Sequence, residues 1–191
     1  MTELAIIRHG ETDWNAEKRM QGHRDTPLNQ NGLRQAARVA ERLAKERWDA
    51  VVSSDLARAA ETSAIIANRA GISNRLFDRR LRERYLGELE GTTPEERVKR
   101  WGERWHELDH GAESADSLFG RAYRFLEEIC ELHGGKRIIV VTHGGWIKTL
   151  FTRLFPEREL SPPANASLSL IGREEGRWRL ILYNSTEHLN G

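Results

Sequence analysis

The chain has 191 residues, of which 38% are hydrophobic and 31% charged, and its formal net charge is +1. This length fits one domain with a substantial core, and the balanced charge provides no global field that would recruit nucleic acid or an acidic membrane. The single cysteine, Cys130, excludes an internal disulfide, and no stretch approaches the ~20 apolar residues of a membrane span. Since the N-terminus lacks the long apolar segment of a signal peptide, we expect a cytoplasmic protein.

Apolar runs and capping residues predict alternating strands and helices in the first half of the chain. In chain order, these elements are a strand at 4–7, a polar loop to Leu28, a helix over 29–48, a strand at 50–52, a helix to about Arg69 and a weakly signalled strand at 75–77. Asn29 or Asn31 is suited to cap the first helix, and Ser54 or Asp55 the second. Gly71 is a natural terminator of that second helix.

The second half begins with an irregular, charged segment at 88–112 that we expect to be helical in pieces. The elements after it are a helix over 114–133, a strand at 138–142, a short helix over 146–155, and strands at 167–171 and 178–183 that form a hairpin around 174–176. Strand–helix alternation of this kind favours an α/β three-layer sandwich, in which helices cover both faces of a largely parallel sheet. We find no repeat or linker, so residues 1–191 are expected to form a single domain.

Two histidines stand at equivalent places in this pattern. His9 and His143 each follow a predicted buried strand, and each is followed by glycine. Ligands of open α/β sheets bind beyond the carboxyl ends of the strands, so the two imidazoles face one crevice if their strands are neighbours. Taken singly, either histidine is more often a hydrogen-bonded structural group. Together they predict a site for a metal, a phosphate or an acyl group.

Three charged residues favour phosphate over a metal ion. Arg8 precedes the first histidine and would oppose a bound dication, and zinc-type motifs are absent. Arg58 lies in the first turns of the helix after the second strand, where backbone N–H groups and a guanidinium form a natural anion site. Glu83 follows the weak third strand and is a candidate general acid.

Five ordered segments then carry a resemblance to a known family. They are Arg8-His9-Gly10-Glu11-Thr12 with Asn15, Arg19-Met20-Gln21-Gly22 with Asp25-Thr26-Pro27-Leu28, Ser53-Ser54-Asp55-Leu56 with Arg58-Ala59 and Glu61-Thr62, Leu81-Arg82-Glu83 with Gly87 and Glu90-Gly91, and Thr142-His143-Gly144-Gly145. In these segments the sequence resembles the histidine phosphatase superfamily, also called the phosphoglycerate mutase-like family. The resemblance covers nearly the whole chain, in order.

The resemblance implies a role for each matched residue. His9 would attack phosphorus and become a phosphohistidine, and Glu83 would protonate the leaving oxygen and then deprotonate the attacking water. Arg8, Arg58 and His143 would bind the phosphoryl oxygens. The whole implied substrate-binding set is Arg8, His9, Asn15, Gln21, Gly22, Arg58, Glu83, His143 and Gly144. Because its neighbours are cationic, we expect the pKa of His9 to be lowered.

The compactness of the chain after the Glu83 motif resembles the broad-specificity phosphatase branch rather than the longer mutases. We therefore expect metal-independent hydrolysis of a small phosphate ester, with no cofactor, no nucleic acid and no membrane partner, by a monomer or homodimer. The alternatives are a cofactor-dependent phosphoglycerate mutase, and a non-catalytic phospholigand-binding protein that has kept the pocket.

The segment 88–117 is the expected lid or specificity segment. Trp101 and Trp105 are spaced to share a helix face, so they either pack this segment onto the domain or form an apolar wall over the substrate. Arg97, Lys99, Arg100 or Arg104 would then meet a second anionic group, and His23 and Arg24 could also reach the substrate. We expect His106, His110 and His133 at the surface, Cys130 as a structural residue, and His188 at the rim of the site.

Overall fold

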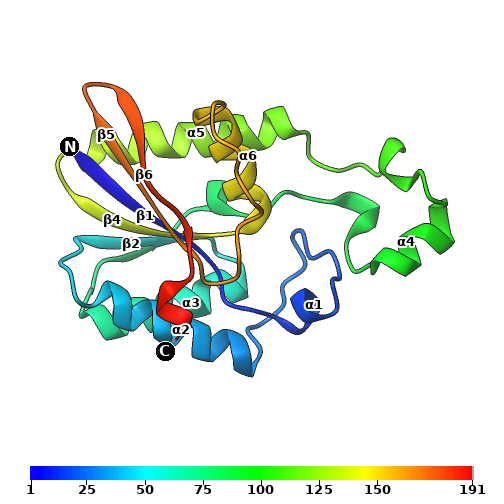
Figure 1. The fold of residues 1–191 in the computed structure, drawn as a ribbon, viewed down its shortest axis with the longest axis horizontal. Coiled ribbons are helices and arrows are strands. Elements are labelled where there is room, and N and C mark those ends of the chain that lie inside the picture. The colour runs from blue at the N-terminus through cyan, green and yellow to red at the C-terminus, as the bar shows by residue number, and fades with distance from the viewer. Residues whose placement is uncertain (191) are drawn as a thin grey trace.

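The computed structural model describes residues 1–190 and is built around a six-stranded sheet with the order β3-β2-β4-β1-β5-β6 (Figure 1). The strands are β1 (Thr2–Arg8), β2 (Ala50–Ser53), β3 (Arg75–Phe77), β4 (Arg137–Thr142), β5 (Leu168–Glu174) and β6 (Arg177–Ser185). The first four strands pair in parallel, whereas β5 runs antiparallel to both β1 and β6. The predicted largely parallel sheet and the predicted hairpin are thus confirmed.

Helices cover both faces of this sheet. The α-helices are α1 (Asp13–Ala16), α2 (Gln30–Leu43), α3 (Ala57–Ala70), α4 (Pro94–Trp101), α5 (Ala115–Leu132) and α6 (Gly144–Leu154), and the 3-10 helices are η1 (Arg79–Leu81), η2 (Gly87–Leu89), η3 (Trp105–Glu107) and η4 (Glu187–Leu189). Alternate residues of the central strands face opposite sides of the sheet. Leu4 and Ile6 pack in one core with residues of α5 and α6, whereas Ala5 and Ile7 pack in a second core with residues of α2 and α3. This burial on both faces explains the continuous apolar runs and confirms the three-layer, single-domain α/β fold.

The ends of the first long helix follow one prediction and depart from another. Asn29 caps α2, because its Oδ1 accepts a hydrogen bond from Gly32 N at 2.8 Å. The helix ends at Leu43, short of the predicted Trp48. Trp48 instead turns back, and its indole N–H donates to the Leu43 carbonyl at 3.1 Å, which also accepts from Glu46 N at the helix end.

The start of α3 corrects a second prediction. Its N-cap is Leu56, which makes no side-chain cap bond, so neither Ser54 nor Asp55 caps the helix. The two oxygens of the Asp55 carboxylate accept from Nε and Nη2 of Arg82, at 2.7 and 2.6 Å. Asp25, from a distant loop, accepts a hydrogen bond from Ala57 N at 2.6 Å in its place. The predicted terminator is confirmed, since Gly71 adopts a left-handed conformation at φ +68°.

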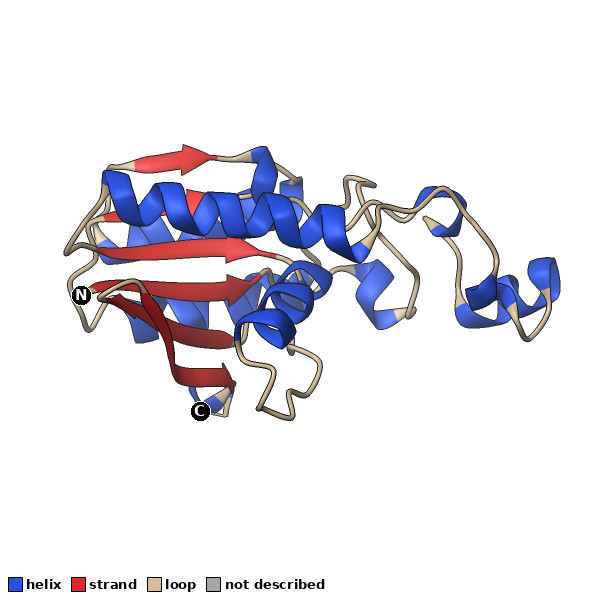
Figure 2. Ribbon diagram, turned by 90° about the horizontal axis from the view of Figure 1, so that it is seen from above, coloured by secondary structure: helices blue, strands red, loops and turns tan. Residues whose placement is uncertain are grey.

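Segment 87–112 extends away from the sheet as an arm (Figures 1 and 2). It is helical in pieces, as predicted, but Trp101 and Trp105 do not share a helix face, because α4 ends at Trp101 and a turn at Gly102 separates it from η3. Trp101 packs against His110 with ring centroids 4.7 Å apart, and Arg97 lies 4.9 Å from the Trp105 ring. These side chains therefore stabilise the arm itself. None of the helices described in residues 1–190 has the length and apolar character needed to cross a membrane.

Candidate active site

The two histidines meet because their strands are neighbours. β1 and β4 pair with Arg8 opposite Thr142, so His9 and His143 leave the sheet side by side. The backbone N–H of His9 donates to the Thr142 carbonyl at 3.0 Å, and the two ring centroids are 5.1 Å apart. Both side chains are buried. The predicted convergence at the carboxyl ends of these strands is confirmed.

The hydrogen bonds of His9 determine which ring nitrogen is free to react. Nδ1 lies 2.7 Å from the Gly10 carbonyl, and because a carbonyl only accepts, Nδ1 carries the hydrogen. Nε2 then presents its lone pair, which accepts a hydrogen bond from Arg58 Nε at 3.2 Å. Burial holds the pKa of His9 well below its ordinary value, and the nearby charges of Arg58 and Arg8 lower it further. The pKa of His9 is lowered as expected, but burial contributes more to this than the neighbouring charges do.

Arg58 is held behind His9 by backbone carbonyls. Its two terminal nitrogens donate to Arg24 O at 2.9 Å and Gly22 O at 2.8 Å, and burial lowers its pKa to about 10. Gly22 has φ +53°, and a Cβ added there would lie 2.0 Å from Glu90 Oε1. The sequence-predicted Gly22 therefore contributes a tight turn whose carbonyl orients Arg58.

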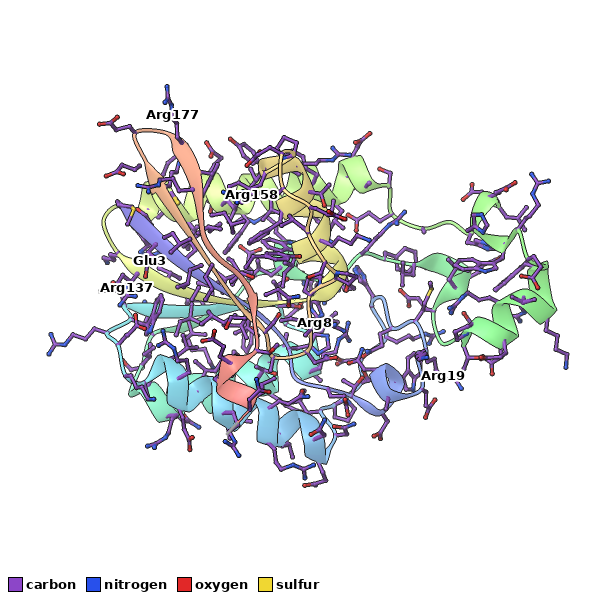
Figure 3. All side chains as sticks on the ribbon, viewed as in Figure 1. Glu3, Arg8, Arg19, Arg137, Arg158 and Arg177 are labelled. Atoms are coloured by element: carbon purple, nitrogen blue, oxygen red, sulfur yellow. The ribbon has the colours of Figure 1, made fainter. Side chains whose placement is uncertain are left out.

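Two buried nitrogens at the site have no hydrogen-bond partner within residues 1–190. They are Nε of Arg8, which lies at the end of β1 (Figure 3), and Nδ1 of His143. The other ring nitrogen of His143 is 2.8 Å from Ser54 Oγ, and Arg8 Nη1 donates to Pro163 O at 2.7 Å. When Ser54 donates its hydroxyl hydrogen, His143 Nδ1 becomes a donor. Buried donors are costly unless paired, so the site favours a ligand with several acceptor oxygens.

Glu83 is fixed against the start of α6. Its Oε2 accepts from Gly145 N at 2.9 Å, and its Oε1 accepts from Trp146 N at 3.0 Å and Arg84 N at 2.8 Å. A Cβ on Gly145 would lie 2.6 Å from Oε1, so glycine is needed for this approach. The carboxyl therefore sits directly beside the segment that carries His143.

The remaining predicted residues surround this centre. Asn15 Oδ1 accepts from Thr12 in a capping box and from Asn165 Nδ2 at 3.1 Å. Asn165 also donates to His9 O at 3.2 Å, a contact that no sequence signal indicated. Gln21 is buried, with its Oε1 accepting from Thr26. Gly144 begins α6, where an added Cβ would lie 3.2 Å from Arg8 Nε.

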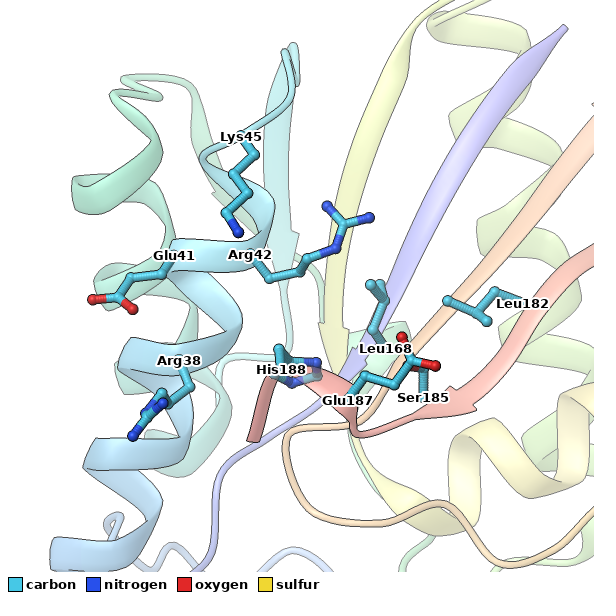
Figure 4. A pocket seen from close by; sticks show the side chains of 9 residues that line it. All are labelled: Arg38, Glu41, Arg42, Lys45, Leu168, Leu182, Ser185, Glu187 and His188. Carbon is cyan, nitrogen blue, oxygen red and sulfur yellow. The ribbon is translucent and has the colours of Figure 1, made fainter. Parts of the chain in front are cut away.

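Other candidate residues lie away from the two histidines. His110 is buried rather than at the surface, because its Nε2 donates to Trp105 O at 2.7 Å inside the arm. Cys130 is buried in α5, and burial raises the pKa of its thiol. His188 donates to Ala166 O at 2.9 Å and lines a separate cavity of about 400 Å³ between α2 and the end of β6 (Figure 4). Within residues 1–190, no group of three His, Cys, Asp or Glu side chains is arranged to bind a metal ion.

Comparisons with known proteins identify the family of the chain. A family model described as histidine phosphatase superfamily (branch 1) matches residues 4–186. The chain is 41% identical to phosphoglycerate mutase-like protein 4 of Arabidopsis thaliana, over 98% of the chain and 86% of that protein. It is 36% identical to a metal-independent phosphoserine phosphatase of the same plant, over 100% of the chain and 84% of that protein. A solved mycobacterial glucosyl-3-phosphoglycerate phosphatase, in complex with VO3, superposes with a TM-score of 0.86 at 32% identity, over 96% and 99%.

Proposed function

The chain belongs to branch 1 of the histidine phosphatase superfamily and is a phosphomonoesterase, and we propose that it hydrolyses small phosphate esters through a phosphohistidine on His9. The observation that carries this mechanism is the state of His9. Its Nδ1 is committed to the Gly10 carbonyl, and burial keeps the ring neutral, so Nε2 offers a lone pair. A neutral, oriented imidazole is the form that can attack phosphorus.

The groups around Nε2 would bind the phosphoryl oxygens. Arg58 and Arg8 supply positive charge, and His143 Nδ1 and Arg8 Nε are the buried donors without protein partners. Charge that develops in phosphoryl transfer is stabilised best by donors already in place. Two guanidiniums and an imidazole can perform this neutralisation, so we propose that no metal ion is required.

Glu83 would act on the leaving group. As the bond between phosphorus and the ester oxygen breaks, the protonated carboxyl gives its hydrogen to that oxygen, and the alcohol leaves. The resulting carboxylate then takes a proton from the water that attacks the phosphohistidine, which releases phosphate and restores His9. The contacts from Gly145 and Trp146 hold the carboxyl in a fixed position for both steps.

The arm would contribute to substrate choice, as the lid or specificity segment 88–117. A cavity of about 370 Å³ lies between the arm and the loop before it, lined among others by Met20, Arg84, Leu89 and Trp105. Arg84 adjoins Glu83 in the chain, and we propose that part of the leaving group occupies this cavity. Arg97 is buried within the arm, where it donates to Thr92 O at 2.7 Å. One relative is named as a phosphoserine phosphatase and another as a glucosyl-3-phosphoglycerate phosphatase, so we propose these two esters as the first substrates to test. We also propose that the protein acts in the cytoplasm.

A mutase is the second candidate, because one relative is a phosphoglycerate mutase-like protein. The two activities differ in the acceptor of the phosphoryl group. A hydrolase releases inorganic phosphate from a monoester without any added bisphosphate, whereas a cofactor-dependent mutase requires one for sustained turnover.

The mechanism is tested by trapping the intermediate. Acid-sensitive, base-stable phosphoenzyme should accumulate when turnover is stopped by rapid quench, and mass spectrometry should locate the phosphoryl group on His9. His9→Ala should abolish both the adduct and nearly all phosphate release, whereas His133→Ala, a change at the C-terminal end of α5, should preserve both. His143→Ala should slow formation of the adduct without moving it. Phosphate on His143, or full activity of His9→Ala, would overturn the mechanism.

A further inference from the structure

Glu83 lies on a stretch of backbone that neither a strand nor a helix holds in place. Residues 82–86 connect η1 to η2, and among their carbonyl groups only that of Leu86 has a helical partner, Leu89 N at 3.1 Å. A general acid must be placed accurately, because an error of about 1 Å can cost on the order of a hundredfold in rate. Some side chain from a rigid element must therefore hold this stretch.

Arg121 of α5 supplies that support. Its Nη1 donates to Arg80 O at 2.7 Å and Arg82 O at 2.6 Å, and its Nη2 donates to Glu83 O at 2.8 Å. Arg121 lies on α5 between Leu118 and Ala122, both of which are fully buried in the core. The guanidinium is thus anchored to a rigid helix and binds three carbonyls of the segment that carries the acid.

Glu113 fixes the guanidinium from the other side. Its Oε1 accepts from Arg121 Nε at 2.8 Å and its Oε2 from Arg121 Nη2 at 2.9 Å, and both side chains are largely buried, at 16% and 14% exposed. Together with the three carbonyls, this pairing employs all five N–H groups of the arginine. Glu113 N also donates to Tyr85 O at 2.9 Å, just after Glu83. The pair therefore joins α5, the acid segment and the end of the arm.

We propose that Arg121, held in place by Glu113, is a positioning residue for Glu83 in protonation of the leaving group. This role rests on the proposed function, because it is exerted through Glu83. The carboxyl end of Glu83 is oriented from α6. Its backbone carbonyl accepts from Arg121 on α5 and also from His23 Nε2, in the loop after α1, at 2.8 Å. Loss of Arg121 removes the support that comes from a rigid helix and leaves the carboxyl bound but misplaced. A lysine cannot replace the planar fork, because an ammonium has three donors around one point.

The test is the dependence of rate on the leaving group. kcat/KM is measured for an alkyl phosphate such as phosphoserine and for 4-nitrophenyl phosphate, whose leaving group needs little protonation. Glu83→Gln should lose about 10²–10⁴-fold on the alkyl ester, the usual range for general acid catalysis, and much less on the activated ester. Arg121→Gln should reproduce this asymmetry with a loss of about 10–100-fold on the alkyl ester, as expected of misplacement rather than removal.

Two further variants separate positioning from general stability. Arg121→Lys should show a smaller asymmetry in the same direction, and it supplies the measurement if Arg121→Gln does not fold. Arg124→Gln is the matched control, because Arg124 lies on the same helix, is exposed, and donates only to Gly120 O in its own helix. It should leave both rates unchanged.

The outcomes distinguish the two levels of the proposal. Suppose that Glu83→Gln shows the asymmetry. The positioning role of Arg121 is then overturned if the Arg121 variants lose activity equally on both esters, or lose none. If Glu83→Gln itself shows no asymmetry, the acid role of Glu83 fails, and the role of Arg121 fails with it.

Discussion

The burial of two neutral histidines predicts that the protein loses stability in mild acid. Burial is the main cause that holds the pKa of both His9 and His143 well below 6.5, the ordinary value. The unfolded chain takes up protons at these rings near pH 6.5, whereas the folded chain does not until much lower pH. Since the unfolded state binds more protons in this window, the free energy of unfolding falls as pH decreases through it, and is unaffected by these groups above it.

The size of the effect follows from proton linkage. Each histidine that stays neutral in the folded state contributes a slope of at most about 1.4 kcal/mol per pH unit. One unit below the ordinary pKa, the two rings together have lowered the free energy of unfolding by about 2.8 kcal/mol. This is a large part of the roughly 5–15 kcal/mol that stabilises a typical domain.

Urea unfolding of the wild type and of His9→Asn, between pH 8 and 5.5, measures this contribution. The difference in unfolding free energy between the two proteins should shift by about 1.4 kcal/mol in favour of the variant as pH falls, and His143→Asn should shift it similarly. Other titrating groups cancel in the difference, including His188, whose pKa burial also lowers. Phosphate buffer must be avoided, because an anion that binds the folded site adds stability of its own. A difference that does not vary with pH would refute the assignment of neutral, buried rings.

Two other predictions concern activity. Because guanidiniums and an imidazole provide the charge neutralisation, phosphate release should survive excess EDTA, and a loss restored by Mg²⁺ or Zn²⁺ would contradict a metal-independent site. Gly145→Ala should slow the hydrolysis of alkyl esters more than that of 4-nitrophenyl phosphate, because the added Cβ would lie 2.6 Å from Glu83 Oε1. Gly120→Ala is the control and should leave both rates unchanged, because the Cβ added there meets nothing within 4 Å. Equal behaviour of the two variants would argue against the steric reasoning.

Local sequence signals determined the helices and strands and the positions of His9 and His143 at the ends of two buried strands. The apolar runs before His9 and His143 form buried strands because both faces of a parallel sheet are covered, and such strands need hydrophobic residues at every position. Asn29 and Gly71 mark helix ends because capping depends on the residue itself and its immediate neighbours. The α/β fold followed from the order of these elements.

Only the tertiary structure decided which distant groups meet. The central position of β4 between β1 and β2 brings Ser54 to His143, and the path of the chain after β3 brings Glu83 to the start of α6. A carboxylate suited to cap a helix can equally bind a guanidinium from far along the chain, and Asp55 does so with Arg82. The same holds for Arg121, whose sequence shows only a charged residue on an amphipathic helix. Hydrogen-bond partners of this kind are chosen by proximity in the folded state, which local residue patterns do not encode.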